Sequence, residues 1–176
     1  TLVLTAAGVL DLATNGATLD VALGTTNDGT ITGGAGLVTF SGTVTNNDTI
    51  TAGAGGITFG GTVTNNTGTL AAGDYLIETT GTAEIQGGTV TIGDGTVDAI
   101  GSITTLTSTG TATIDGNAAG FTVNDLSSGD LTTDGVVYLH GTNIGTLTVN
   151  GGSTLNLNGE LITSGAITVD GALVTG

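Results

Sequence analysis

Apolar and polar residues alternate along short stretches of this 176-residue chain. In residues 38–45 (VTFSGTVT), Val38, Phe40 and Val44 fall on one side, and threonine and serine fall on the other. Alternation at every second position predicts β-strands with one buried face. The chain lacks apolar residues at helical spacing, and it contains 34 glycines. We therefore expect essentially no α-helix.

The strands belong to a repeat. Residues 26–44 (TNDGTITGGAGLVTFSGTV) and 45–63 (TNNDTITAGAGGITFGGTV) align without gaps, with 13 of 19 positions identical, and a degraded third copy begins at Thr64. In a β-solenoid each repeat forms one coil, and equivalent residues of successive coils lie above one another. We expect these stacked pairs: Phe40 on Phe59, Val44 on Val63, and Asn46 near Asn65.

These patterns predict an all-β fold, a parallel β-solenoid of about nine coils and about 45 Å in length. The alternative is an antiparallel β-sandwich, which also joins short strands by glycine turns. We expect a single domain over residues 1–176, most regular over 26–82. Residues 1–12 are apolar enough to be a terminal strand that is exchanged between subunits.

Composition excludes several functions. The chain has no Lys or Arg and 15 acidic residues, giving a net charge of −15. Nucleic-acid binding needs cations against phosphates, so we exclude it. No run of apolar residues is long enough for a spanning helix, so we expect no membrane insertion. The absence of Cys excludes disulfides and thiol chemistry. Since no compact catalytic cluster stands out, we expect no enzyme.

Both ends of the chain read as strands, and uncovered strand edges invite pairing with another chain. We therefore expect the protein to assemble with itself, end to end or by strand exchange. The expected subunit contacts are apolar residues near the two ends: Leu2, Val3, Leu4, Val169, Leu173 and Val174.

Coils such as residues 145–171 (GTLTVNGGSTLNLNGELITSGAITVDG) resemble the β-helical repeats of bacterial surface proteins. Such proteins include autotransporter passengers, haemagglutinin-like adhesins and surface-layer or filament proteins. The resemblance rests on composition and rhythm over the whole chain. It implies an extracellular or cell-surface structural subunit that forms a fibre or matrix. An adhesin that binds a glycan or a protein receptor is the alternative, and an exposed patch around Tyr75 or Tyr138 would support it.

A third possibility is an ice-binding solenoid. Thr-x-Thr pairs occur at 43/45, 49/51, 62/64, 89/91 and 146/148. A flat array of such pairs resembles the ice-binding face of β-helical antifreeze proteins. Threonine is also simply a good exposed strand residue. Because the coils vary after the third repeat, the sequence predicts no regular array.

We expect no cofactor, with Ca²⁺ as the one weak candidate. Oxygen ligands on one strand face suit this ion, and no recognised calcium motif is present. The candidate residues are Asp28, Asp48, Asn156, Asn158 and Glu160, with a further acidic pair at Asp94 and Asp98.

Two residue types remain. His140 shares a strand side with Val136 and Tyr138, which predicts a surface or inter-subunit contact and not a catalytic triad. Asn47 and Asn65 begin N-glycosylation acceptor patterns that we place at the same phase of adjacent repeats, in turns.

Overall fold

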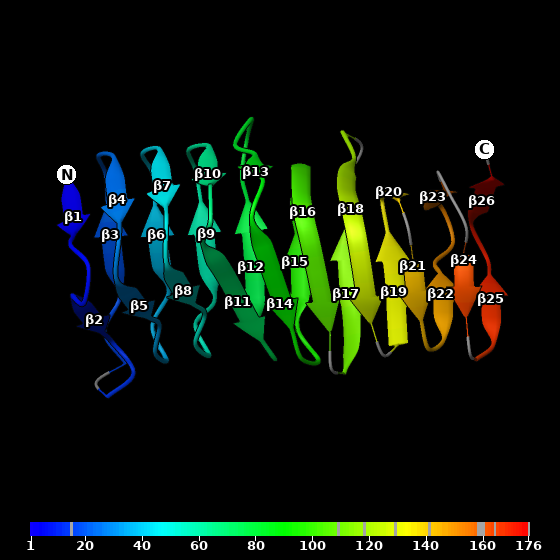
Figure 1. Ribbon diagram of the computed structural model, residues 1–176, viewed down its shortest axis with the longest axis horizontal. Coiled ribbons are helices and arrows are strands. Elements are labelled where there is room, and N and C mark those ends of the chain that lie inside the picture. Colours follow the sequence, from blue (N-terminus) through cyan, green and yellow to red (C-terminus); the bar gives the residue numbers. More distant parts are fainter. Residues whose placement is uncertain are drawn as a thin grey trace.

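The computed structural model is a rod in which short strands stack side by side along the long axis (Figure 1). It describes residues 1–14, 16–108, 110–117, 119–128, 130–140, 142–157, 161–163 and 165–175, without the side chains of 111, 125–128, 142–144 and 161–163. This described part contains strands and turns but no helix, and so no helix that is long and apolar enough to cross a membrane. All its strand pairings are parallel. The β-solenoid is confirmed, and the antiparallel sandwich is wrong.

Each coil presents three faces to solvent. The first face contains β1 (Leu2–Leu4), β4 (Thr25–Asn27), β7 (Val44–Asn46), β10 (Val63–Asn65), β13 (Ile85–Gln86), β20 (Val136–Leu139), β23 (Thr154–Leu157) and β26 (Ala172–Thr175). The second contains β2 (Val9–Asp11), β5 (Thr30–Thr32), β8 (Thr49–Thr51), β11 (Thr69–Gly73), β14 (Thr89–Ile92), β21 (Thr142–Ile144) and β24 (Leu161–Thr163). The longer strands β16 (Gly101–Ser108) and β18 (Phe121–Ser128) run across both of these faces.

The third face is a separate sheet of nine strands, which agrees with a count of about nine coils. Its strands are β3 (Leu19–Val21), β6 (Val38–Phe40), β9 (Ile57–Phe59), β12 (Leu76–Thr79), β15 (Thr96–Asp98), β17 (Thr111–Asp115), β19 (Asp130–Asp134), β22 (Leu147–Val149) and β25 (Ile167–Val169).

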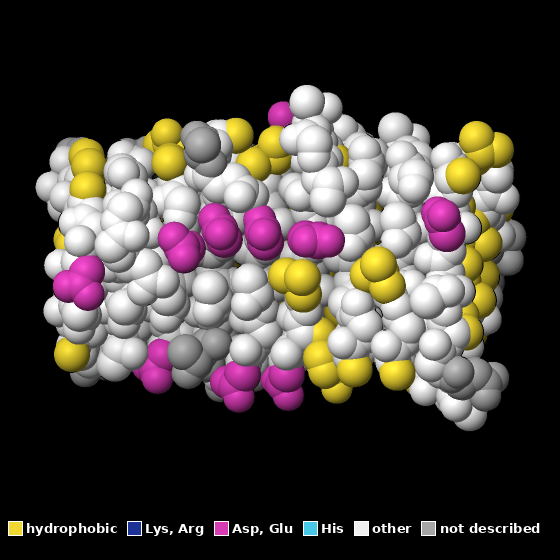
Figure 2. All heavy atoms as spheres, turned by 180° about the vertical axis from the view of Figure 1, so that it is seen from behind, with side chains coloured by type: hydrophobic (Ala, Val, Ile, Leu, Met, Phe, Trp, Pro, Cys, Tyr) yellow, Lys and Arg dark blue, Asp and Glu magenta, His cyan; other side chains and the backbone are white. Residues whose placement is uncertain are grey.

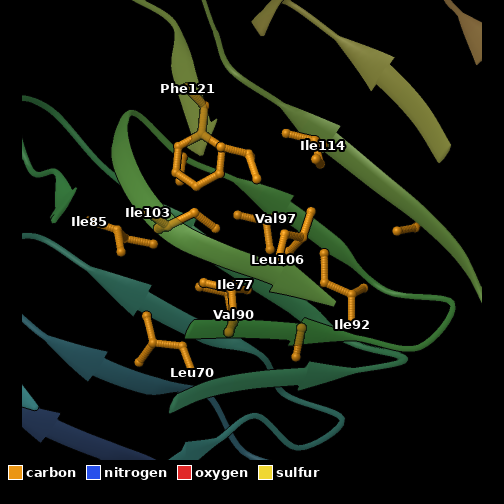
Figure 3. Close-up of a cluster of buried hydrophobic side chains, with 14 of the residues drawn as sticks. Leu70, Ile77, Ile85, Val90, Ile92, Val97, Ile103, Leu106, Ile114 and Phe121 are labelled. Atoms are coloured by element: carbon orange, nitrogen blue, oxygen red, sulfur yellow. The ribbon is translucent and has the colours of Figure 1, made fainter. Parts of the chain in front are cut away.

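The core is a set of apolar columns between the three faces. Phe40 lies on Phe59 with ring centroids 5.5 Å apart and planes at 14°, and Val44 pairs with Val63, as expected. In the middle of the rod, buried Ile, Leu and Val side chains from different faces converge (Figure 3). Small residues bring the coils together at the corners, since a Cβ on Gly53 would collide with the Gly34 carbonyl oxygen.

An asparagine ladder runs inside the first face. Asn27, Asn46 and Asn65 are fully buried and stack in register. The amide of Asn27 donates to Asn46 Oδ1 at 2.7 Å, and the amide of Asn46 donates to Asn65 Oδ1 at 2.8 Å. Each amide also donates to a backbone carbonyl in a neighbouring coil, at 3.2–3.3 Å. The ladder satisfies polar groups that would otherwise be costly to bury.

Thr133 interrupts an apolar column, because it is paired on either side with Ile114 and Val149. Its side chain is fully buried, and its hydroxyl has no hydrogen-bond partner among the residues that the structure describes. Replacing Thr133 with the near-isosteric valine should raise the free energy of unfolding by about 1 kcal/mol, because an unsatisfied buried hydroxyl is removed. Urea unfolding measures the change, and Thr132→Val on the solvent side is the control. Equal effects of the two substitutions would contradict this reading.

Residues 1–12 form the first coil of their own chain, since β1 pairs with β4 and β2 pairs with β5. Strand exchange between subunits stays a prediction.

Candidate functional site

The second face carries two columns of threonine, which we call the threonine face. Alternation within each strand turns these side chains outward, because the residue between them is buried. Strand register stacks Thr30, Thr49, Thr69, Thr89 and Thr105 in one column, and Thr32, Thr51, Ala71, Thr91 and Thr107 in the other. The columns therefore extend over five successive coils without a charged residue.

This array corrects the expectation of irregularity. The pairs at 49/51 and 89/91 belong to it, whereas 43/45 and 62/64 lie at the first face and 146/148 at the third. The pairs predicted from the sequence did not include Thr30, Thr32, Thr69, Thr105 and Thr107. The coils differ in length, but the threonine positions stay in register, and the shift in the pairing of β11 with β14 lies after Ala71, beyond the array.

The array has one gap, at Ala71. A hollow lies there, lined by Thr51, Ala71, Thr91 and Thr107 together with the turn residues Gly73 and Asp74. Among the described threonines of the array, Thr49 alone donates its hydroxyl to another protein group, to Asp48 Oδ1 at 3.2 Å. The other described hydroxyls of the array are therefore available to solvent.

The third face carries an acidic column. Glu78, Asp98, Asp115 and Asp134 stack on one another in successive coils. Asn150 and Asp170 continue the column, since they follow the paired residues Val149 and Val169. Figure 2 shows acidic side chains in a row along the rod on the face seen from behind. Because coil length is not constant, these acids do not align in the sequence repeat, and the column was not predicted.

Hydrogen bonds stabilise the charged form of two acids. Donation by the hydroxyl of Thr146 at 2.6 Å, and by its backbone N–H at 2.9 Å, lowers the pKa of Asp130. Donation by the Gly135 N–H and by the Ser153 hydroxyl lowers the pKa of Asp134. These bonds stabilise the folded protein at pH values above the ordinary carboxyl pKa. The contribution is lost as pH falls through the lowered values.

Asp115 lies between Asp98 and Asp134, and like charges directly opposite one another are destabilising. Asp115→Asn should raise the free energy of unfolding by about 0.5 kcal/mol at low salt, because it removes this repulsion. Its Oδ1 accepts the Asn117 N–H at 2.8 Å, and an asparagine oxygen can do the same. Urea unfolding with and without 0.5 M NaCl checks the result, since salt should shrink the gain. A gain that salt does not change would point to a cause other than charge.

Of the calcium candidates within the described residues, Asp28, Asp48 and Asn156 are not brought together. Asp28 accepts the Asn47 amide at 2.7 Å and stacks on that residue, not on Asp48. Asn156 stacks between Tyr138 and Val174. Asn158 and Glu160 lie outside the described residues. Within the described part of the chain, no three acidic or histidine side chains form a metal-sized group.

Asp94 and Asp98 do not lie in the same column of side chains. Asp98 belongs to the acidic column, whereas the backbone N–H of Asp94 donates to Asp74 Oδ1 at 3.0 Å. The two residues therefore do not form a shared site.

The prediction that Asn47 and Asn65 occupy equivalent positions of adjacent repeats is wrong. Asn65 is level with Asn46, and Asn47 is level with Asn66. Asn65 is fully buried in the asparagine ladder, so its amide is not accessible to a glycosyltransferase. Asn47 is half-buried and bonded to Asp28.

The remaining surface candidates are scattered. Tyr75 lies at a corner after β11 and is 43% exposed, whereas Tyr138 is half-buried in β20, so the two rings form no common patch. His140 is half-buried on the same side as Tyr138, as the alternation predicts.

The predicted subunit contacts lie at the two ends of the rod. Val3, Val169 and Val174 are 60%, 40% and 47% exposed. Leu2, Leu4 and Leu173 are half-buried against the core.

No family model matches this chain, and no curated protein or solved structure matches it either. The fold therefore defines the class, a parallel β-solenoid repeat protein, and function is argued from the geometry of its faces.

Proposed function

We propose that this protein is a non-catalytic extracellular rod whose threonine face binds ice. The observation that supports the proposal is the in-register array of threonines over five coils, four of which carry a threonine pair. The array is uncharged although the chain has 15 acidic residues, and an acidic column occupies the third face instead.

The spacing of the array suits an ordered layer of water. Alternate residues of a strand lie about 6.6 Å apart, and stacked strands lie about 4.8 Å apart. The hydroxyls and methyls therefore form a regular two-dimensional grid, which is the kind of surface that can order a layer of water. Each threonine offers a hydroxyl for hydrogen bonding and a methyl that favours release of disordered water. Because the sheet is already ordered, binding adds many weak contacts at little further entropic cost.

Thermal hysteresis and partition into a slowly growing ice hemisphere test the proposal. We expect the purified protein to shape ice crystals, to depress their growth temperature and to be enriched in the ice fraction. Crystalline cellulose and chitin provide a comparison, since they also have periodic hydroxyl surfaces. Exclusion from ice, with or without sedimentation on the polysaccharides, would overturn the proposal.

We propose as a second candidate a subunit of a surface fibre or matrix, in line with the resemblance to bacterial surface repeats. One outward-facing column of the first face runs from Val3 at one end of the rod to Val174 at the other. Between these apolar ends its side chains are polar, for example Thr26, Thr45 and Thr64. End-to-end pairing of β1 with β26 of another copy would bring these two exposed valines together.

Negative-stain microscopy of the concentrated protein tests the fibre. Filaments with an axial repeat near the rod length of about 45 Å would support it. Discrete rods at every concentration would contradict it. Without Lys or Arg, subunits join by backbone pairing and apolar packing and not by salt bridges. Assembly that 0.5 M NaCl abolishes and chelators leave unchanged would contradict that mode of contact.

A further inference from the structure

The turn between β22 and β23 contains an asparagine–glycine pair, in which Asn150 is half-buried and Gly151 is exposed. The Ser153 N–H donates to the Asn150 carbonyl at 3.1 Å, which closes a β-turn, and Gly152 has a φ of +87°. A Cβ on Gly151 or Gly152 would meet nothing within 4 Å, so the turn projects into open space. Among the described residues, the Gly151 N–H makes no backbone hydrogen bond.

We propose that Asn150 is a site of spontaneous deamidation that inserts a new carboxylate into the acidic column. The Gly151 nitrogen attacks Cγ of Asn150 and a C–N bond forms. The Cγ–Nδ2 bond then breaks, and ammonia leaves with the proton from Gly151. Water opens the resulting succinimide to aspartate or isoaspartate. The steps need water alone and involve no oxidation, and glycine favours them because no side chain shields the attacking nitrogen.

The position of Asn150 gives the reaction a structural consequence. Asn150 lies between Asp134 and Asp170, and its side chain contributes, after Gly135 and Ser153, to lowering the pKa of Asp134. Deamidation replaces the neutral amide with a carboxylate, which repels its neighbours on both sides. The column would then carry six acids in successive coils, at positions 78, 98, 115, 134, 150 and 170. The reaction therefore weakens the pairing of β22 with β25 as the protein ages.

Asn117 is a matched control within the same chain. Its amide also donates to the acidic column, to Asp98 at 2.6 Å, but Ala118 follows it. After incubation of the full chain at mildly alkaline pH, peptic peptides are analysed by mass spectrometry, since trypsin has no site. We expect conversion at Asn150 to be about tenfold faster than at Asn117, because the following glycine leaves its nitrogen unshielded.

Two variants complete the test. Gly151→Ala should fold normally, since Gly151 has room for a Cβ and no positive φ, and it should slow conversion about tenfold. Asn150→Asp reproduces one product and should lower Tm at low salt, with 0.5 M NaCl restoring part of the loss. Equal rates at Asn150 and Asn117, or a rate that Gly151→Ala leaves unchanged, would overturn the proposed site. An unchanged Tm in Asn150→Asp would overturn its structural consequence.

Discussion

Asn46→Leu lowers the free energy of unfolding by about 3 kcal/mol, because partners inside the core are left without hydrogen bonds. Asn46 is the middle rung of the asparagine ladder, accepting from Asn27 and donating to Asn65 and to the Thr69 carbonyl. Leucine has a similar volume and makes none of these bonds. Urea unfolding at neutral pH measures the loss.

Two controls separate the ladder from general damage. Asn66→Leu removes a 2.8 Å bond to Asn47 on the exposed side of the same coil, and it should cost no more than about 0.5 kcal/mol. Replacing Asn27, Asn46 and Asn65 together with leucine removes every member of the ladder. That triple variant should be more stable than Asn46→Leu, since fewer buried polar groups lack partners. A triple variant that loses the sum of three single losses would refute this account.

Thr69→Tyr should weaken ice binding by about tenfold, which corresponds to about 1.4 kcal/mol. Thr69 is the central member of its column, between Thr49 and Thr89. A tyrosine there stands above the plane of the methyl and hydroxyl groups and separates both columns from a flat ice surface. Thermal hysteresis at equal protein concentration measures the effect. Thr64→Tyr is the matched control, on the exposed first face of the same coil, and should leave ice binding unchanged.

Ala71→Thr provides a test in the opposite direction. The hollow at Ala71 has room for a threonine side chain between Thr51 and Thr91, so the substitution completes the second column. We expect greater hysteresis than in the unmodified protein. If Thr64→Tyr and Thr69→Tyr reduce hysteresis equally, or Ala71→Thr reduces it, the threonine face is not the binding surface.

The sequence predicted the fold well where neighbouring coils have equal length. The near-identical 19-residue repeats correctly predicted the stacking of Phe40 on Phe59 and of Asn46 on Asn65. The prediction failed where turns change length. From the sequence alone, Glu78 and Asp98 do not align with Asp115, although the strands that carry them are in register. Hydrophobic alternation fixes which side a residue faces. The corner between strands decides which residue is its neighbour in the next coil.

The candidate functional surfaces could be predicted only by knowing which residues are neighbours in successive coils. Thr105 and Thr107 belong to a long strand that crosses two faces. Alternation along this strand does not say on which residues of the preceding coil the two threonines stack. The pairing of Asp28 with Asp48 assumes that the two acids stack between coils, whereas Asp28 is level with Asn47 in the structure.

The asparagine ladder also divides the rod into parts of unequal resistance to local opening. It ties β4, β7 and β10 together and ends at Asn65, since the next coil continues with Gly87 and Gly88 at positive φ. Coils held by buried side-chain bonds, in addition to strand pairing, open at higher free energy. Amide hydrogen exchange should therefore be slowest around these three strands and faster toward β25 and β26. Local unfolding that starts at the last coils would stop at the ladder, because the coils there need more free energy to open.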